Sequence, residues 1–183
     1  MENNDIDKVS TENLGPVWGD EPLKRSRTIN RNRTTTTVYT TLGKIKGSIK
    51  RLENGRNVFT FKKIPYAEPP IGNLRFAKPQ PVKPWKNTLD VSSNSEAPMS
   101  IQVPALSPDS KYIIGQENCL YLNVFAPEPC LNSILWTSGN TPNIPVIIWI
   151  HGGAFCIGNN DSKIYGPEIL LKNDVVLVTI NYR

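Results

Sequence analysis

The feature that most constrains this chain is an apolar run that ends in a pair of glycines. Residues 146–150 are Val-Ile-Ile-Trp-Ile, and His151, Gly152 and Gly153 follow directly. A run that is apolar at every position, and not only at alternate ones, is typical of a strand buried on both faces of a parallel sheet. Glycine lets the backbone bend sharply and leaves its N–H groups uncovered. We therefore expect a buried strand followed by a loop of accessible backbone donors.

Backbone donors at the end of such a strand suit acyl transfer, because they can hold the negative charge of a tetrahedral intermediate. The reaction also requires a serine nucleophile and a base that takes its proton and later returns it. His151 is the single histidine and opens the loop, so we assign it to holding the loop and not to the base. No Gly-x-Ser-x-Gly occurs in the 183 residues. We expect this chain alone to be inactive.

Three further blocks accompany the loop. Residues 64–76 are IPYAEPPIGNLRF, residues 117–125 are ENCLYLNVF and residues 174–183 are DVVLVTINYR. Together with the loop, and in this order, they resemble the type-B carboxylesterases, the carboxylesterase and cholinesterase family of α/β-hydrolase fold. The resemblance runs from about residue 39 to residue 183. The segment IYGP at residues 164–167 is similar to that of insect-type cytosolic esterases.

The resemblance implies an oxyanion hole made by the backbone N–H groups of Gly153 and Ala154. Gly152 would supply the bend and His151 would support the loop. Ala154 stands where the family often has a third glycine, but a methyl group leaves the N–H in place. The serine nucleophile, the acid and the histidine base would lie beyond Arg183. The chain is thus expected to be the N-terminal part of a hydrolase that acts on small-molecule carboxylic esters.

A second interpretation belongs to another functional class. Some members of the same fold family are non-catalytic and serve adhesion or binding, having lost the catalytic residues. Those relatives are normally secreted or membrane-anchored, whereas residues 1–15 lack the basic start and apolar core of a signal peptide. The intact glycine loop and the missing signal peptide favour the hydrolase.

Two other positions are informative only through the resemblance. It brings Arg75 and Glu117 together as a buried or half-buried ion pair with a structural role, while Asn118 stands where the family usually has aspartate. Secreted members join the position of Cys119 to an upstream cysteine, and residues 90–102 contain none. The missing partner favours the reducing cytoplasm, with secretion expected only if the N-terminus is incomplete.

Composition excludes several other functions. The net charge is +5, and a basic cluster lies within residues 24–33 of a polar segment, residues 1–33, that we predict to be a disordered arm. No aromatic residues interleave these charges, so we expect no nucleic-acid binding, and the apolar runs are too short to span a membrane. One histidine and three scattered cysteines do not have the spacing of a zinc site, and no phosphate-binding glycine loop is present. We expect no metal and no cofactor.

Residues 34–183 are expected to form the truncated esterase domain, of class α/β. An antiparallel N-terminal meander would lead into the first parallel strands, with a short helix at residues 167–172 on the crossover. The predicted strands are residues 34–39, 43–49, 58–64, 120–125, 146–150 and 175–180. We expect the last two to present bare apolar faces, with 175–180 at an open edge of the sheet.

Overall fold

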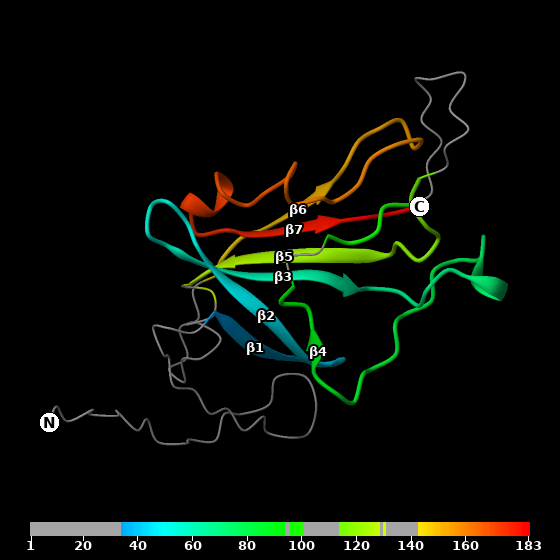
Figure 1. The fold of residues 1–183 in the computed structure, drawn as a ribbon, viewed down its shortest axis with the longest axis horizontal. Coiled ribbons are helices and arrows are strands. Elements are labelled where there is room, and N and C mark those ends of the chain that lie inside the picture. Colours follow the sequence, from blue (N-terminus) through cyan, green and yellow to red (C-terminus); the bar gives the residue numbers. More distant parts are fainter. Residues whose placement is uncertain (1–33, 94–95, 101–113, 129, 131–142) are drawn as a thin grey trace, which may run out of the picture.

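The computed structural model describes residues 34–93, 96–100, 114–128, 130 and 143–183. The arm predicted for residues 1–33 lies outside the described residues. The described chain forms one mixed sheet with the strand order β1-β2-β3-β5-β7-β6, and a short strand, β4, pairs with β2 (Figure 1). The strands are β1 (Thr35–Thr40), β2 (Gly43–Arg51), β3 (Asn57–Pro65), β4 (Leu89–Asp90), β5 (Tyr121–Pro127), β6 (Val146–Ile150) and β7 (Val176–Ile180).

Most neighbouring strands are antiparallel. Strands β1, β2, β3, β5 and β7 pair in that manner one after another, whereas β6 and β7 are parallel, as is the two-residue contact of β4 with β2. Figure 1 shows β1 and β2 running obliquely to β5 and β7, which reflects the twist of the sheet. The six predicted strands are all present within two residues of their expected bounds.

The crossover between β6 and β7 differs from the prediction. In place of a helix over residues 167–172 it contains a 3₁₀ turn, η2 (Leu170–Lys172), and a second such turn, η1 (Gly72–Leu74), follows β3. The backbone N–H of Asn173 donates to the carbonyl of Leu170, three residues back, which closes the turn before an α-helix can form. The side chain of Arg56, between β2 and β3, donates to the carbonyl of Lys172 at 2.6 Å and ties the crossover to the meander.

Two of the apolar clusters lie on opposite faces of the sheet, because neighbouring residues of β3 and of β5 belong to different clusters. One includes Leu171 of η2 and the other packs against Trp85, in the segment before β4. Gly43 at the β1–β2 turn has a φ of +134°, and a Cβ there would lie 2.6 Å from Trp85, so this position requires glycine. The first cluster contains Leu52, Val58, Phe125, Leu171 and Leu177, and the second contains Ile45, Phe61 and Val91.

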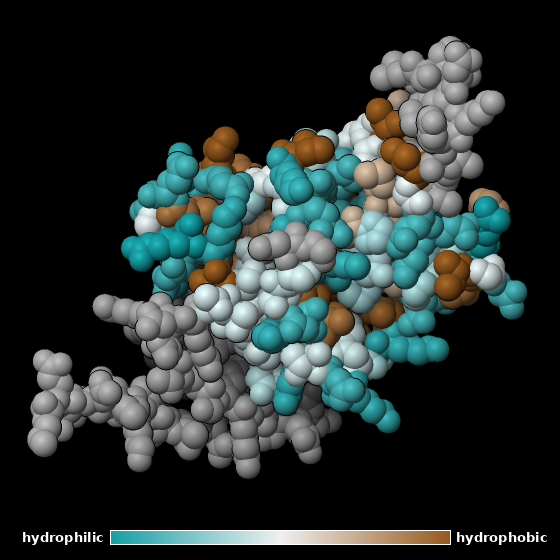
Figure 2. All heavy atoms as spheres, viewed as in Figure 1, coloured by the Kyte–Doolittle hydropathy of each residue, from teal (hydrophilic) through white to brown (hydrophobic). Residues whose placement is uncertain are grey.

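The open edge of the sheet is β6, not β7. Strand β7 lies between β5 and β6, and its Leu177 and Thr179 are buried. Among the described residues β6 pairs only with β7, and its five side chains are 38–62% exposed. The prediction of an edge at residues 175–180 was wrong. After β6 the chain returns to the sheet between β6 and β5, so β7 has a neighbour on each side and β6 is left at the edge. On the face seen in Figure 2, hydrophobic side chains reach the surface as separate groups.

Candidate functional site

The loop after β6 has an unusual backbone. Gly153, Ala154 and Phe155 all have positive φ angles, of 128°, 53° and 60°. Only glycine adopts such angles without cost, and a non-glycine residue held there costs on the order of 1–3 kcal/mol. The left-handed stretch begins at Gly153 and not at Gly152, so the bend lies one residue later than the sequence suggested. A strained backbone of this kind is stable only when contacts with the surrounding structure hold it in place.

One carbonyl group closes the turn inside this loop. The backbone N–H groups of Cys156 and Ile157 donate to the carbonyl oxygen of Gly153, at 2.9 and 3.0 Å. Within the described part of the chain, the N–H groups of Gly153 and Ala154 themselves donate to no acceptor. The loop therefore presents two consecutive N–H donors, and a ligand oxygen can accept a hydrogen bond from each of them.

The glycines of the loop differ in what they tolerate. A Cβ at Gly153 would lie 1.8 Å from the carbonyl oxygen of Ile157, and a Cβ at Gly158 would lie 2.1 Å from Nδ1 of His151. A Cβ at Gly152 would meet nothing within 4 Å. Close packing thus requires glycine at residues 153 and 158 but not at residue 152. The role of Gly158 had no signal in the sequence.

His151 is buried at the start of the loop. Its ring stacks on that of Tyr182, with centroids 4.4 Å apart, and its Nδ1 lies 2.9 Å from the carbonyl oxygen of Gly152. The hydroxyl of Tyr182 donates to the carbonyl oxygen of His151 at 2.9 Å. The Nε2 atom is buried and has no partner among the described residues. These contacts connect His151 to the loop and to the residue that follows β7 closely.

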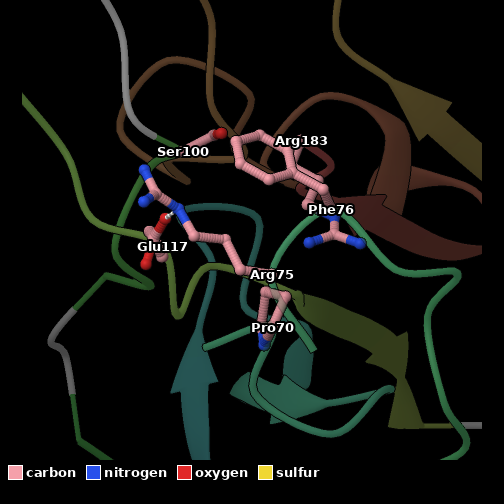
Figure 3. A pocket seen from close by; sticks show the side chains of 6 residues that line it. All are labelled: Pro70, Arg75, Phe76, Ser100, Glu117 and Arg183. Carbon is pink, nitrogen blue, oxygen red and sulfur yellow. Dashed lines mark ion pairs between the residues drawn. The ribbon is translucent and has the colours of Figure 1, made fainter. Parts of the chain in front are cut away.

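Arg75 and Glu117 form an ion pair through Arg75 Nε and Glu117 Oε1 (Figure 3). The side chains are 55% and 31% exposed, so this pair is open to solvent and not buried. An exposed pair contributes about 0–1 kcal/mol. It borders a cavity of about 520 Å³ lined by Pro70, Arg75, Phe76, Ser100, Glu117 and Arg183.

Cys119, Cys130 and Cys156 all lie in the described residues, and none of them forms a disulfide there. Cys119 and Cys130 are buried, and burial raises the pKa of both thiols, that of Cys130 to about 11. Cys156 is exposed and lies in the loop after Gly153. The thiolate is the reactive form of cysteine, so the two buried thiols are poor nucleophiles.

Comparison with known proteins identifies the family. Residues 34–183 match the sequence model of the carboxylesterase family. The chain is 40% identical over 146 residues to juvenile hormone esterase of Tribolium castaneum, covering 80% of this chain and 23% of that protein. It is 39% identical over 150 residues to para-nitrobenzyl esterase of Bacillus subtilis, covering 80% and 27%. The crystal structure of juvenile hormone esterase from Manduca sexta with OTFP covalently attached superposes with a TM-score of 0.66 at 35% identity, covering 81% and 26%.

This chain therefore belongs to the carboxylesterase family. Its described residues, which are mostly strands, correspond to the N-terminal part of an α/β-hydrolase esterase. It spans about a quarter of the length of the curated relatives it matches. The family resemblance and the recognition of the type-B class from sequence are confirmed.

Proposed function

We propose that this chain supplies the oxyanion hole of a carboxylic-ester hydrolase of the type-B class. The observation that carries the proposal is the pair of unengaged N–H groups at Gly153 and Ala154, on a strained loop that follows a parallel strand. Family membership supports an ester substrate. The nucleophile and the base would come from chain outside these 183 residues, since the sequence has one histidine and no Gly-x-Ser-x-Gly.

The chemistry assigns a definite task to the two donors. A serine Oγ bonds to the ester carbonyl carbon, its proton passes to the base, and the carbonyl oxygen becomes negatively charged. The N–H groups of Gly153 and Ala154 stabilise that charge. The alcohol then leaves with the proton, and water hydrolyses the acyl-enzyme. Loss of one such donor costs roughly 10²–10³ in kcat.

A chimaera with an active relative provides the test. Residues 34–183 would replace the matching segment of the Bacillus subtilis para-nitrobenzyl esterase, and hydrolysis of a p-nitrophenyl ester would be measured. Gly153→Ala places a Cβ 1.8 Å from a backbone oxygen and displaces the donors, so we expect kcat to fall about 10²-fold. Gly152→Ala is the matched control, because its Cβ has free space.

The non-catalytic interpretation predicts a different result. A folded chimaera would still react with an organophosphate at the relative's serine, yet Gly153→Ala and Gly152→Ala would have equal turnover. That outcome would exclude an oxyanion role for the loop. The 183-residue chain by itself should not exceed the buffer rate, because removal of a nucleophile or base costs on the order of 10⁶ in kcat.

A further inference from the structure

The far end of the loop is held by one buried amide. The side chain of Asn160 is 1% exposed, and its Nδ2 donates to two backbone carbonyl oxygens, those of Tyr121 at the start of β5 and Thr179 near the end of β7, each at 3.3 Å. These two strands are neighbours in the sheet. Asn160 therefore lies across the junction of β5 and β7 and joins the loop to both strands.

The main chain of Asn160 is held as well. Its carbonyl oxygen accepts a hydrogen bond from Nδ2 of Asn123 at 2.9 Å. Asn123 is fully buried on β5, donates also to Oγ1 of Thr179 at 3.1 Å, and accepts from the backbone N–H of Lys63 at 2.9 Å. Lys63 lies at the bulge of β3. One network of hydrogen bonds thus connects β3, β5 and β7 to the loop.

The position requires an asparagine for chemical reasons. Two carbonyl oxygens face the side chain, and only a group with two N–H donors and no negative charge satisfies both. A carboxylate of the same shape would place oxygen against oxygen, and an apolar side chain would offer no donor. The Oδ1 atom of Asn160 is buried without a partner in the described part of the chain. A buried acceptor without a partner costs free energy. The two hydrogen bonds donated by Nδ2 of the same amide offset that cost.

We propose that Asn160 is a positioning residue for the loop donors. Tyr182 fixes the first end of the loop at His151, and Asn160 fixes the second end against the sheet. Between these points the backbone of residues 153–155 is left-handed, a conformation that persists only when both ends are held. Without the Asn160 amide the loop relaxes and the N–H groups of Gly153 and Ala154 lose their placement. The catalytic meaning of this inference rests on the proposed function.

The buried position of Asn160 also bears on a glycosylation motif in the sequence. Asn160-Asp161-Ser162 has the pattern of an N-glycosylation site. A glycan would be attached at Nδ2, the atom that bonds to Tyr121 and Thr179, and no space exists for it at 1% exposure. The asparagine of this motif thus serves the fold, and we expect no glycan there in the folded chain.

Amide hydrogen exchange on the 183-residue chain tests the inference without any turnover. The N–H groups of Cys156 and Ile157 report on the loop, because both donate to Gly153, and the N–H of Ile49 on β2 reports on the meander. In Asn160→Ala we expect exchange at the two loop amides to become at least about 10-fold faster, with Ile49 changed less than twofold. Asn159→Asp is the control, since its Oδ1 can still accept from the N–H of Asp161.

Two outcomes would overturn the inference. Loop exchange in Asn160→Ala within twofold of wild type would show that the amide does not hold the loop. An equal acceleration of exchange at the loop amides and at Ile49 would show that Asn160 stabilises the whole fold and not the loop in particular. In the chimaera, the same substitution should lower kcat by roughly 10²-fold and leave KM within twofold, as expected for misplaced donors. An inactive parent chimaera would count against the proposed function but would leave the exchange result valid.

Discussion

The hydroxyl of Tyr182 lies 2.9 Å from the carbonyl oxygen of His151, and the two rings stack with an interplanar angle of 15°. Tyr182 follows β7 and His151 follows β6, and these strands are parallel and in register up to the pair Ile150 and Ile180. The end of one strand therefore anchors the loop that leaves the other. The loop is held by its neighbour in the sheet even though β6 itself is an edge strand.

Tyr182→Phe separates the hydrogen bond from the stacking. The ring remains over His151, but the carbonyl oxygen loses its donor, so we expect the free energy of unfolding to fall by about 1 kcal/mol. Tyr182→Ala removes both contacts and should cost more. Urea denaturation measures both variants. Equal stability of Tyr182→Phe and wild type would show that water replaces the hydroxyl without cost.

Ala154→Gly should stabilise the chain. Ala154 has a φ of 53°, a conformation that costs an L-residue roughly 1–2 kcal/mol and glycine almost nothing. Added freedom of the unfolded chain removes about 0.4–1 kcal/mol of that gain. We expect a net increase of about 0.5–1 kcal/mol in the free energy of unfolding. Ala77→Gly is the control, because Ala77 has no positive φ and should lose stability. A loss in both variants would argue against strain at Ala154.

The buried pair of Lys62 and Glu96 predicts a pH dependence. Lys62 Nζ lies 2.5 Å from Glu96 Oε1, and the side chains are only 11% and 17% exposed. Burial raises the pKa of Glu96, but hydrogen bonds from Lys62 and Ser162 outweigh it and hold the pKa below the usual value of a glutamate. Because the folded pKa is the lower one, the stabilisation is complete above the unfolded pKa and is lost as the pH falls through the folded value.

Glu96→Gln measures this contribution. At neutral pH we expect a loss of roughly 3 kcal/mol, because Lys62 stays buried without a counter-charge. The difference between wild type and variant should shrink as the pH falls below the unfolded pKa of glutamate, about 4.3. Glu168→Gln is the matched control, since its pair with Lys50 is about half exposed and is worth about 0–1 kcal/mol. A difference that is independent of pH from 7 to 3 would contradict the assignment.

Much of the sheet could be predicted from sequence because its signals are local. Alternation, glycine turns and apolar runs located the strands, and the run at residues 146–150 located the loop. The order of the strands in the sheet, in contrast, has no local signal in the sequence. Nothing in the residues of β7 shows that it returns between β5 and β6, and this return decides which strand is the edge. Asn160 was hidden for the same reason, since the meaning of its amide depends on carbonyl oxygens from Tyr121 and Thr179.

The exposed strand β6 predicts that the chain associates in solution. Its side chains are apolar and its outer edge pairs with no described strand, a combination that templates pairing between molecules. Ile148 is 62% exposed, so Ile148→Lys adds a charge at that edge with little cost in packing. We expect this variant to shift the chain towards monomer in sedimentation velocity. Thr36→Lys adds the same charge to β1, the opposite edge, and should leave the association unchanged. Equal shifts in both variants would attribute the effect to net charge, and a monomeric wild type would show that the edge of β6 is protected.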